Sequence, residues 1–424
     1  MRMHKVYPRP LHLSIIIMHY IMYFYVFFTF GQEILLHLCI LCGKLNARNK
    51  QRGIFMTEIR NAVLTVDLAI LRENIARIAG SLGGAGILPV LKADAYGLGM
   101  VRMARALEGE CSVAGFAVAQ VSEGLTLREA GIAKDILVLG KALPLQAEAA
   151  IAAGLTLTVG SVSDVSTFDA IAKRLGTQAR VQISFDTGLH RIGIDETNFY
   201  ACADELCRAG SLDVRGAYSH FADTDDDARC REQFTLFQAL CDRLEAAGIP
   251  LPMRHISDSA ASERFPEFNL DAVRLGRRLC WDAPTGRQYG TRELATLTAQ
   301  VLDVRTRKRG ERVGYGEGIL LDRDAEIAVL GIGYGDGLSE RMAEKRLPVL
   351  LGGKPCPMLY TFMDQALLDV TGANAHPGDT ATIFGYAPDG TLLSAQAQAL
   401  ACGENEGCAL TTALLPRVCR VYRE

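Results

Sequence analysis

The sequence predicts an α/β protein: an N-terminal (β/α)8 (TIM) barrel followed by a mostly antiparallel β domain. Two observations carry this prediction. Strand-like and helical patterns alternate eight times before about residue 288, which is typical of a closed parallel barrel. After Gly290 short strand-like runs follow one another closely, as in an antiparallel domain. The alternative is an open doubly wound sheet. Its dinucleotide-binding version is disfavoured because no G-x-G-x-x-G motif follows the first strand.

Residues 1–55 form an apolar N-terminal extension that differs from the rest of the chain. The run Leu11–Phe30 is long enough to span a bilayer. Because Met56 opens a sequence that also suits a cytosolic start, the extension is either a mis-started, dispensable segment or a membrane anchor. In both cases we expect a cytoplasmic enzyme body, and in the second it would be anchored to the inner membrane. The segment is excluded from the fold prediction.

Residues 56–66 are predicted to form a strand that joins the C-terminal β domain, and 67–288 are predicted to form the barrel. Leu68, Leu71, Ile75 and Ile78 recur at helical spacing after the first strand. The eight predicted barrel strands are 87–91, 115–119, 135–139, 155–159, 180–185, 213–219, 252–257 and 271–275. Helical patterns between them include 121–130, 196–209 and 228–247.

Residues 289–424 are predicted to form the β domain. The predicted strands are Thr296–Val304, Ile327–Leu330, Pro348–Leu351, Ala366–Val370 and Thr380–Phe384, with one helix near 393–401. Turn signals such as Gly352-Gly353 and Asp389-Gly390 separate several of these runs.

Composition excludes several classes of function. The 424 residues carry a net charge of -3, which leaves no basic surface for nucleic acid. The 12 cysteines are scattered and fit reduced thiols in the cytoplasm. The only C-x-x-C pair, Cys39 and Cys42, lies in the extension without histidines at suitable spacing, so we predict no metal site.

Chemically capable side chains follow the predicted barrel strands, where barrel enzymes place their active sites. They are Lys92, Arg191, His220, Ser259, and Arg274 with Gly276. Lys92 ends an apolar strand, so we expect its neighbours to desolvate the amine and make it a nucleophile or base. Taken singly, each has an ordinary structural explanation: a salt-bridge arginine, a hydrogen-bonded histidine or a helix-capping serine. Their convergence on one rim favours a shared site.

A lysine facing cations and backbone amides suggests a Schiff base with a phosphorylated aldehyde, for which pyridoxal 5'-phosphate is the common cofactor. Its phosphate would lie at Ser259 and Gly276, with the hydroxyl of Tyr96 as a further donor. A glycine at 276 would let the backbone approach that phosphate closely.

The residues from about Met56 to Tyr422 resemble pyridoxal-phosphate-dependent alanine racemases, of the alanine/serine racemase family of fold type III. Eight motifs occur in the family's order, and together they are far more specific than any one of them. They are Lys92–Gly97 (KADAYG), Asp186–Gly193 (DTGLHRIG), Ser219–Ala222 (SHFA), Ser257–Ala260 (SDSA), Val273–Gly276 (VRLG), Val313–Gly316 (VGYG), Gly333–Gly337 (GYGDG) and Met363–Gln365 (MDQ).

The resemblance implies a two-base amino-acid racemase that interconverts L- and D-alanine. Lys92 would form the internal aldimine and act as the base on one face of the substrate, and Tyr315 would be the base on the other. In the family this tyrosine comes from the partner subunit, so a homodimer with shared active sites is implied. Met363 of that subunit would bind the substrate carboxylate through its backbone amide.

The remaining implied residues bind the cofactor. Arg274, supported by His220, would keep the pyridine nitrogen unprotonated, because a guanidinium does not give up its proton. Arg191 would meet the phenolic oxygen and the substrate carboxylate. The phosphate would be held by Tyr96, Ser259 and Gly276.

Several positions depart from the family pattern and put the substrate in doubt. Cys408 falls where a tyrosine commonly contacts the phosphate and borders the substrate methyl, so serine or a broader set of amino acids is the alternative substrate. Phe362 replaces a common cysteine, and Asp258 a common asparagine. Further departures are Leu98 for histidine, Ser184 for a modified lysine, Leu275 for proline, and Leu279-Cys280-Trp281 for Leu-Tyr-Gly.

Three other functions are each compatible with part of the sequence. A related decarboxylase would carry an acidic residue in place of Arg274. A non-catalytic pyridoxal-phosphate-binding barrel protein would lack the β domain with Tyr315. A membrane-anchored sensor depends only on residues 11–30.

Overall fold

The structure, a computed structural model, describes residues 60–281 and 289–424. The predicted extension, including Leu11–Phe30, lies outside these residues. Within them, no helix is both long and apolar enough to cross a membrane.

The N-terminal part is a barrel of eight short strands, as predicted. Its strands are β2 (Gly86–Pro89), β3 (Phe116–Val118), β4 (Ile136–Val138), β5 (Thr156–Val159), β6 (Ala179–Ser184), β7 (Leu212–Tyr218), β8 (Arg254–His255) and β9 (Ala272–Leu275). Strands β3 to β8 form one parallel sheet in chain order, and β2 pairs in parallel with β9.

Backbone contacts join the two sheets into a ring. Bridges from Ile87 to Val113 and from Val90 to Ala117 connect β2 to the β3 side. On the other side, the Asp271 and Arg274 amides donate to the Arg254 and Ser257 carbonyls. All eight strands run in the same direction, so their carboxyl ends meet at one rim.

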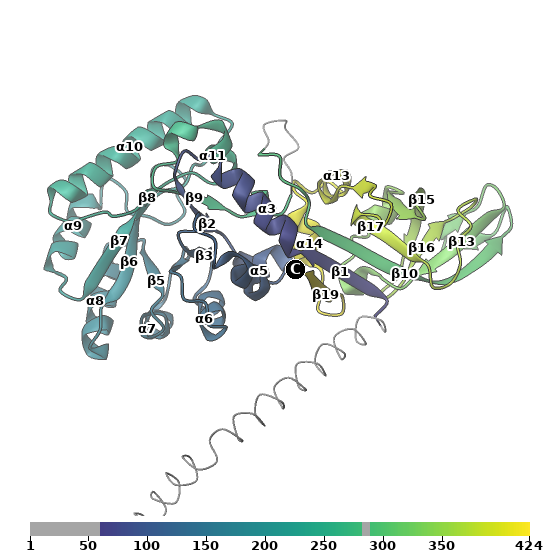
Figure 1. Cartoon of the computed structure of the whole chain (residues 1–424), viewed down its shortest axis with the longest axis horizontal. Coiled ribbons are helices and arrows are strands. Elements are labelled where there is room, and N and C mark those ends of the chain that lie inside the picture. The colour runs from purple at the N-terminus through teal and green to yellow at the C-terminus, as the bar shows by residue number, and fades with distance from the viewer. Residues whose placement is uncertain (1–59, 282–288) are drawn as a thin grey trace, which may run out of the picture. The chain divides into compact units, whose positions relative to one another are not determined.

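Helices cover the outside of the barrel because each turns an apolar stripe toward the strands. They are α3 (Leu68–Ala79), α5 (Met100–Leu107), α6 (Val121–Glu129), α7 (Pro144–Ala152), α8 (Val162–Leu175), α9 (Phe199–Arg208), α10 (Asp227–Ala246) and α11 (Ser259–Arg264). Short turns complete this part: α4 (Lys92–Gly97), η1 (Pro266–Phe268) and η2 (Arg277–Leu279). Figure 1 shows the strands inside and the helices outside.

The C-terminal part is built on one nine-stranded sheet with the order β18-β17-β14-β15-β16-β13-β10-β1-β19. The strands of this part are β1 (Ala62–Asp67), β10 (Ala295–Arg307), β11 (Arg312–Val313), β12 (Ile319–Leu320), β13 (Ala325–Leu330), β14 (Pro348–Leu351), β15 (Lys354–Thr361), β16 (Ala366–Asp369), β17 (Thr380–Tyr386), β18 (Leu392–Leu393) and β19 (Cys419–Arg423). Pairing is antiparallel except between β1 and β19. Strand β17 also pairs with β10, which closes six of the strands on themselves.

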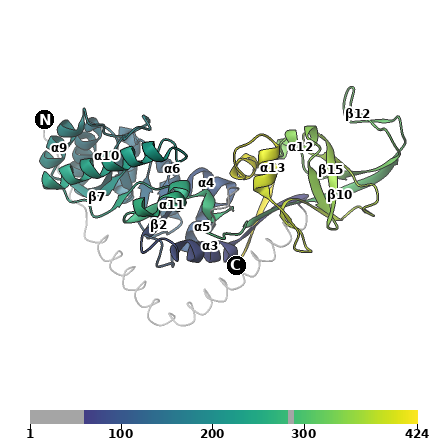
Figure 2. The same cartoon turned by 90° about the horizontal axis from the view of Figure 1, so that it is seen from above.

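Short helices accompany these strands, and Figure 2 shows α12 and α13 beside them. They are η3 (Tyr334–Asp336), α12 (Arg341–Glu344), α13 (Ala395–Ala401) and α14 (Cys408–Ala413). The N-terminal strand β1 lies in this sheet, between β10 and β19. Strand β1 thus leads directly from the β domain into the barrel helix α3.

Candidate active site

A cavity of about 750 Å³ opens at the carboxyl ends of the barrel strands. Seven of the nine residues singled out from the sequence line it: Lys92, Tyr96, Arg191, His220, Ser259, Arg274 and Gly276. They lie at the ends of, or after, strands β2, β6, β7, β8 and β9. The prediction that strand ends converge on one site therefore matches their positions.

Lys92 begins a tight turn shortly after β2. The next four residues, Ala93 to Tyr96, have left-handed backbone angles with φ between 52° and 59°. Such angles are costly for residues with a side chain, so neighbouring groups must hold the turn in place. The Ala93 amide donates to the Glu123 carboxylate at 2.7 Å, and the Thr411 hydroxyl donates to the Tyr96 carbonyl at 2.7 Å.

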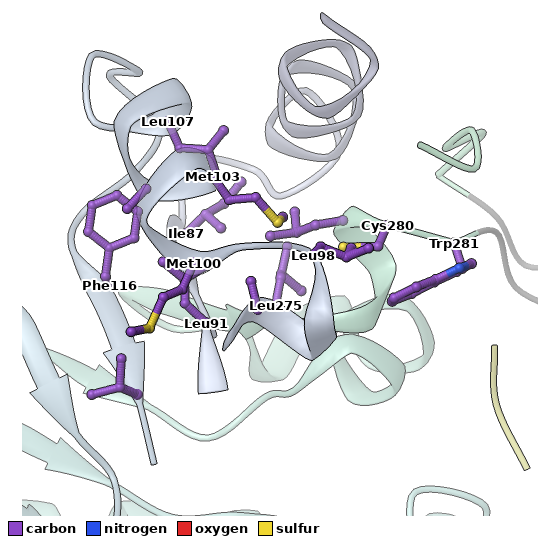
Figure 3. Packing of buried hydrophobic residues seen from close by; sticks show 14 of the residues in the cluster. Ile87, Leu91, Leu98, Met100, Met103, Leu107, Phe116, Leu275, Cys280 and Trp281 are labelled. Carbon is purple, nitrogen blue, oxygen red and sulfur yellow. The ribbon is translucent and has the colours of Figure 1, made fainter. Parts of the chain in front are cut away.

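Apolar residues on both sides of the turn fix its ends in the barrel wall. Leu91 and Leu98 are fully buried with Leu275 and Met103, and Figure 3 shows these side chains gathered around the turn. Leu98, where the resemblance implied histidine, therefore serves as a core residue. Lys92 itself is exposed. The expectation that its neighbours desolvate the amine is wrong for this structure, because the side chain leaves the buried strand at an open rim.

Arg274, near the end of β9, is buried with 5% of its surface exposed, in contrast to the exposed Lys92. Its Nη2 donates to the carbonyls of Ser219 at 2.7 Å and Ile256 at 2.8 Å. Burial lowers the pKa of Arg274 to about 10, so the guanidinium remains a cation at neutral pH.

Two histidines accept hydrogen bonds from Arg274. Nδ1 of His255 lies 2.5 Å from Nη1, and Nδ1 of His220 lies 3.2 Å from Nη2. A guanidinium only donates, so each imidazole accepts through Nδ1 and carries its proton on Nε2. His255 Nε2 then donates to the Gln182 side chain at 2.8 Å. Burial and the charge of Arg274 lower the pKa of His220 to about 4 and that of His255 well below its usual value. Both rings are therefore neutral at pH 7.

Another side of the cavity is formed by Tyr96, Gly276 and Ser259. A Cβ atom at 276 would overlap the Tyr96 hydroxyl, so glycine is required for the two to lie together. Ser259 is the first residue of α11, but the capping residue is Asp258. Its Oδ1 accepts from the Ala260 and Ala261 amides, both at 3.0 Å. Asparagine could accept the same capping bonds through its side-chain oxygen. Aspartate at position 258 therefore serves the capping role that the family's common asparagine could also fill.

Arg191 is exposed and lies on the loop after β6. The loop is tied by Asp186, whose Oδ1 accepts from the Gly188 and His190 amides at 3.0 and 2.9 Å. Burial opposes ionisation of Asp186, yet these bonds hold its pKa below the usual value. Ser184 donates to the Ile192 carbonyl at 3.3 Å, so it contacts the backbone next to Arg191.

Tyr315 and Met363 do not line the cavity of their own chain. Tyr315 lies between β11 and β12 with 75% of its surface exposed, and Met363 follows β15 with 59% exposed. The Tyr315 ring packs edge to face on Phe362, with centroids 5.0 Å apart. These residues form a separate surface on the β domain.

Comparison with known proteins shows to which family the chain is similar. The models "Alanine racemase, N-terminal domain" and "Alanine racemase, C-terminal domain" match residues 66–284 and 294–422. A curated alanine racemase of Thermobifida fusca is 36% identical over 331 residues, which cover 76% of this chain and 87% of that protein. The solved alanine racemase of Clostridium difficile 630 has a TM-score of 0.79 at 30% identity and covers 86% of this chain and 96% of its own. The structure of alanine racemase from Streptomyces coelicolor A3(2) has a TM-score of 0.80 at 28% identity, with 87% and 99% covered.

The chain belongs to the alanine racemase family. It is therefore an isomerase that depends on pyridoxal 5'-phosphate. The cavity fits this cofactor: it offers a lysine amine, a buried cation with two neutral imidazoles, and a tyrosine hydroxyl seated against a glycine.

The racemase fold also positions residues that strand-end reasoning missed. His255 ends β8 and follows the same strand-end rule as His220, so that signal was present in the sequence. Glu123, Thr411 and Glu406 reach the site from a helix or loop of another region, and no local pattern marks them. Arg277 lines the cavity directly after Gly276.

Proposed function

We propose that this enzyme interconverts L- and D-alanine by proton transfer between two bases, Lys92 and Tyr315. The convergence of Lys92, Arg274 and the other cavity residues on one rim carries the proposal. When bound, pyridoxal 5'-phosphate supplies an electron sink for the negative charge that develops on the substrate α-carbon.

In this mechanism the chain's own groups orient the substrate and move one proton. The exposed amine of Lys92 takes or returns the α-proton on one face, and the Tyr315 hydroxyl does so on the other. Removal on one side followed by delivery on the other inverts the α-carbon. The guanidinium of Arg191 would bind the substrate carboxylate.

In this proposal Tyr315 acts from a second copy of the chain. It lies outside the cavity of its own chain and is well exposed, so the proposal places it in the partner's cavity together with the backbone amide of Met363. We therefore propose a C2-symmetric homodimer that works in the cytoplasm. Ten free cysteines among the described residues agree with a reducing compartment.

Serine is the second candidate substrate. Cys408 lines the cavity and is half-buried, at the position where the family resemblance implied tyrosine. A thiol is smaller than a phenol and leaves more room beside the substrate side chain.

The test uses the full chain loaded with cofactor. We expect bound cofactor to give its visible absorbance, and L-alanine or L-serine to lose optical activity while the α-hydrogen exchanges with solvent. Cofactor binding without exchange of either amino acid would refute the racemase proposal.

The shared site is tested by mixing two inactive variants. We expect Lys92→Ala and Tyr315→Phe each to lower kcat by about a hundredfold or more. Mixed dimers contain one intact site, so co-expression should restore about a quarter of wild-type activity. Tyr200→Phe, an exposed tyrosine on α9, is the matched control and should change nothing. If the mixture stayed inactive although mixed dimers formed, Tyr315 would not act across a subunit boundary.

A further inference from the structure

Arg277 lies where two cavities meet. It directly follows Gly276 and lines the main cavity together with Tyr96 and Ser259. It also lines a second, polar cavity of about 180 Å³. Glu406 and Cys408 line both cavities as well, so these three residues separate them.

The guanidinium of Arg277 takes part in a partly exposed ion pair beside the cavity. It pairs with Glu406, and the two side chains are 36% and 29% exposed. Burial raises the pKa of the Cys408 thiol and of the Tyr96 hydroxyl, and the positive charge of Arg277 opposes both rises. Arg277 therefore places its charge close to both groups.

The next residue shows what a purely structural arginine looks like in this turn. Arg278 is buried and makes two bonds to Glu263, at 2.7 and 2.9 Å. The donors are Nε and Nη2 of the Arg278 guanidinium, and the Glu263 side chain is also almost fully buried. Arg278 lines only the smaller cavity, whereas Arg277 also reaches the larger one.

We propose that Arg277 is a cofactor-binding residue that contacts the phosphate of pyridoxal 5'-phosphate, and that the Glu406 carboxylate competes with this phosphate for the guanidinium. The inference rests on the proposed function, in which Tyr96, Ser259 and Gly276 hold that phosphate. A phosphate held by these groups would lie near Arg277, which directly follows Gly276 and lines the same cavity. The thiol of Cys408 is only a weak hydrogen-bond donor, whereas a guanidinium has five N–H groups and binds phosphate through charge-assisted bonds.

Glu406 gives this contact a distinctive electrostatic signature. A guanidinium can bond a carboxylate and a phosphate at once, and it then separates their negative charges. Without Arg277, Glu406 would face the phosphate directly and repel it. Loss of the arginine therefore removes an attraction and exposes a repulsion, while loss of the Glu406 charge removes only a competitor.

The experiment compares two ligands that differ only in the phosphate. Dissociation constants of pyridoxal 5'-phosphate and of pyridoxal are measured for the full chain freed of cofactor, by absorbance titration. We expect Arg277→Met to weaken pyridoxal 5'-phosphate about ten- to a hundredfold and to leave pyridoxal unchanged. Arg277→Lys, which keeps the charge, should recover part of that loss.

Variants at Glu406 should act with the opposite sign. Glu406→Gln should bind pyridoxal 5'-phosphate as tightly as wild type or more tightly, and adding it to Arg277→Met should recover affinity. Arg305→Met breaks an exposed ion pair with Asp303 in the β domain and serves as the control.

Two outcomes would overturn the inference. Equal weakening of both ligands by Arg277→Met, or weakening by both Arg277→Met and Glu406→Gln, would mean that the pair only supports the fold. An unchanged affinity for pyridoxal 5'-phosphate in Arg277→Met would also exclude the contact. A wild-type chain that binds neither ligand would instead refute the proposed function.

Discussion

Arg274 and Arg277 lie three positions apart at the same rim of the barrel, yet they differ in burial and in hydrogen-bond partners. Arg274 is buried and donates to backbone carbonyls and ring nitrogens of residues at the ends of, or directly after, strands β7 and β8. Arg277 is partly exposed and pairs with one carboxylate from the loop before α14. The first is held by the closed barrel and the second by a single residue of the C-terminal part.

This difference indicates two kinds of contact with a ligand. The surroundings of Arg274 are preorganised, since every group around it is fixed by the barrel before anything binds. The groups around Arg277 can adjust, because its ion pair with Glu406 is partly exposed. Such a pair contributes little to stability and exchanges partners easily. Variants on the Arg274 side should therefore affect the fold, whereas variants on the Arg277 side should affect binding.

The largest effect is expected from Arg274→Met. It leaves the carbonyls of Ser219 and Ile256 and the Nδ1 atoms of His220 and His255 without their donor in a buried region. We expect the free energy of unfolding to fall by more than about 4 kcal/mol. Urea denaturation without cofactor measures it, and Arg277→Met should shift the same curve by less than about 1 kcal/mol. Equal shifts would remove the distinction between the two arginines.

The second effect is a loss of stability at acid pH, caused by the two histidines that accept hydrogen bonds from Arg274. His220 has a folded pKa of about 4 against 6.5 for the free side chain. Unfolded chains thus bind more protons between these values, so stability is complete above about pH 6.5 and falls as the pH drops toward 4. For His220 alone the loss is about 2–3 kcal/mol, and His255 adds to it in the same direction.

The variant His220→Gln checks this assignment, because glutamine cannot be protonated. The charged groups that act on His220 are Arg274, Asp258, Arg191 and Lys92. Denaturation between pH 4.5 and 7 should show a flatter dependence in the variant than in wild type. Parallel curves would mean that other groups cause the loss.

The strand-end rule predicted that Lys92, Arg191, His220, Ser259 and Arg274 lie at one cavity, because a parallel barrel brings all its carboxyl ends to one rim. It needed only the order of strands, which the alternation of patterns supplied. It could not predict how exposed each side chain is. Lys92 was expected to be desolvated and is exposed, since burial of a strand does not extend to the residue that leaves it.

Other features depend on contacts that the sequence does not display. Strand β15 was not predicted, and its two prolines, Pro355 and Pro357, explain why: each lacks a backbone donor. The contact between Arg277 and Glu406 joins regions that are far apart in the chain. The role of Tyr315 came only from the resemblance to a family, because nothing in one chain's own pattern reveals a partner.

The smallest effect tests how the C-terminal part holds the Lys92 turn. Thr411 is fully buried on α14 and donates to the Tyr96 carbonyl at 2.7 Å, so Thr411→Val leaves that carbonyl unpaired with almost no change of shape. We expect unfolding to become easier by about 1–2 kcal/mol. Thr412→Val is a matched control for unfolding, because the exposed Thr412 bonds the Cys408 carbonyl within its own helix, but it is no control for cofactor binding because Thr412 lines the cavity.

The turn carries both Lys92 and Tyr96, so Thr411→Val should weaken phosphate binding. It should have less effect on the hydrogen bonds around Arg274. We therefore expect Thr411→Val to weaken pyridoxal 5'-phosphate a few-fold, while the acid dependence set by His220 stays as in wild type. If Thr411→Val and Thr412→Val gave the same unfolding curves, the left-handed turn would be held by Glu123 and the apolar contacts of Leu91 and Leu98 instead. The β domain would then support the turn through other contacts, such as that of Arg420, whose Nε donates to the Gly97 carbonyl at 3.3 Å.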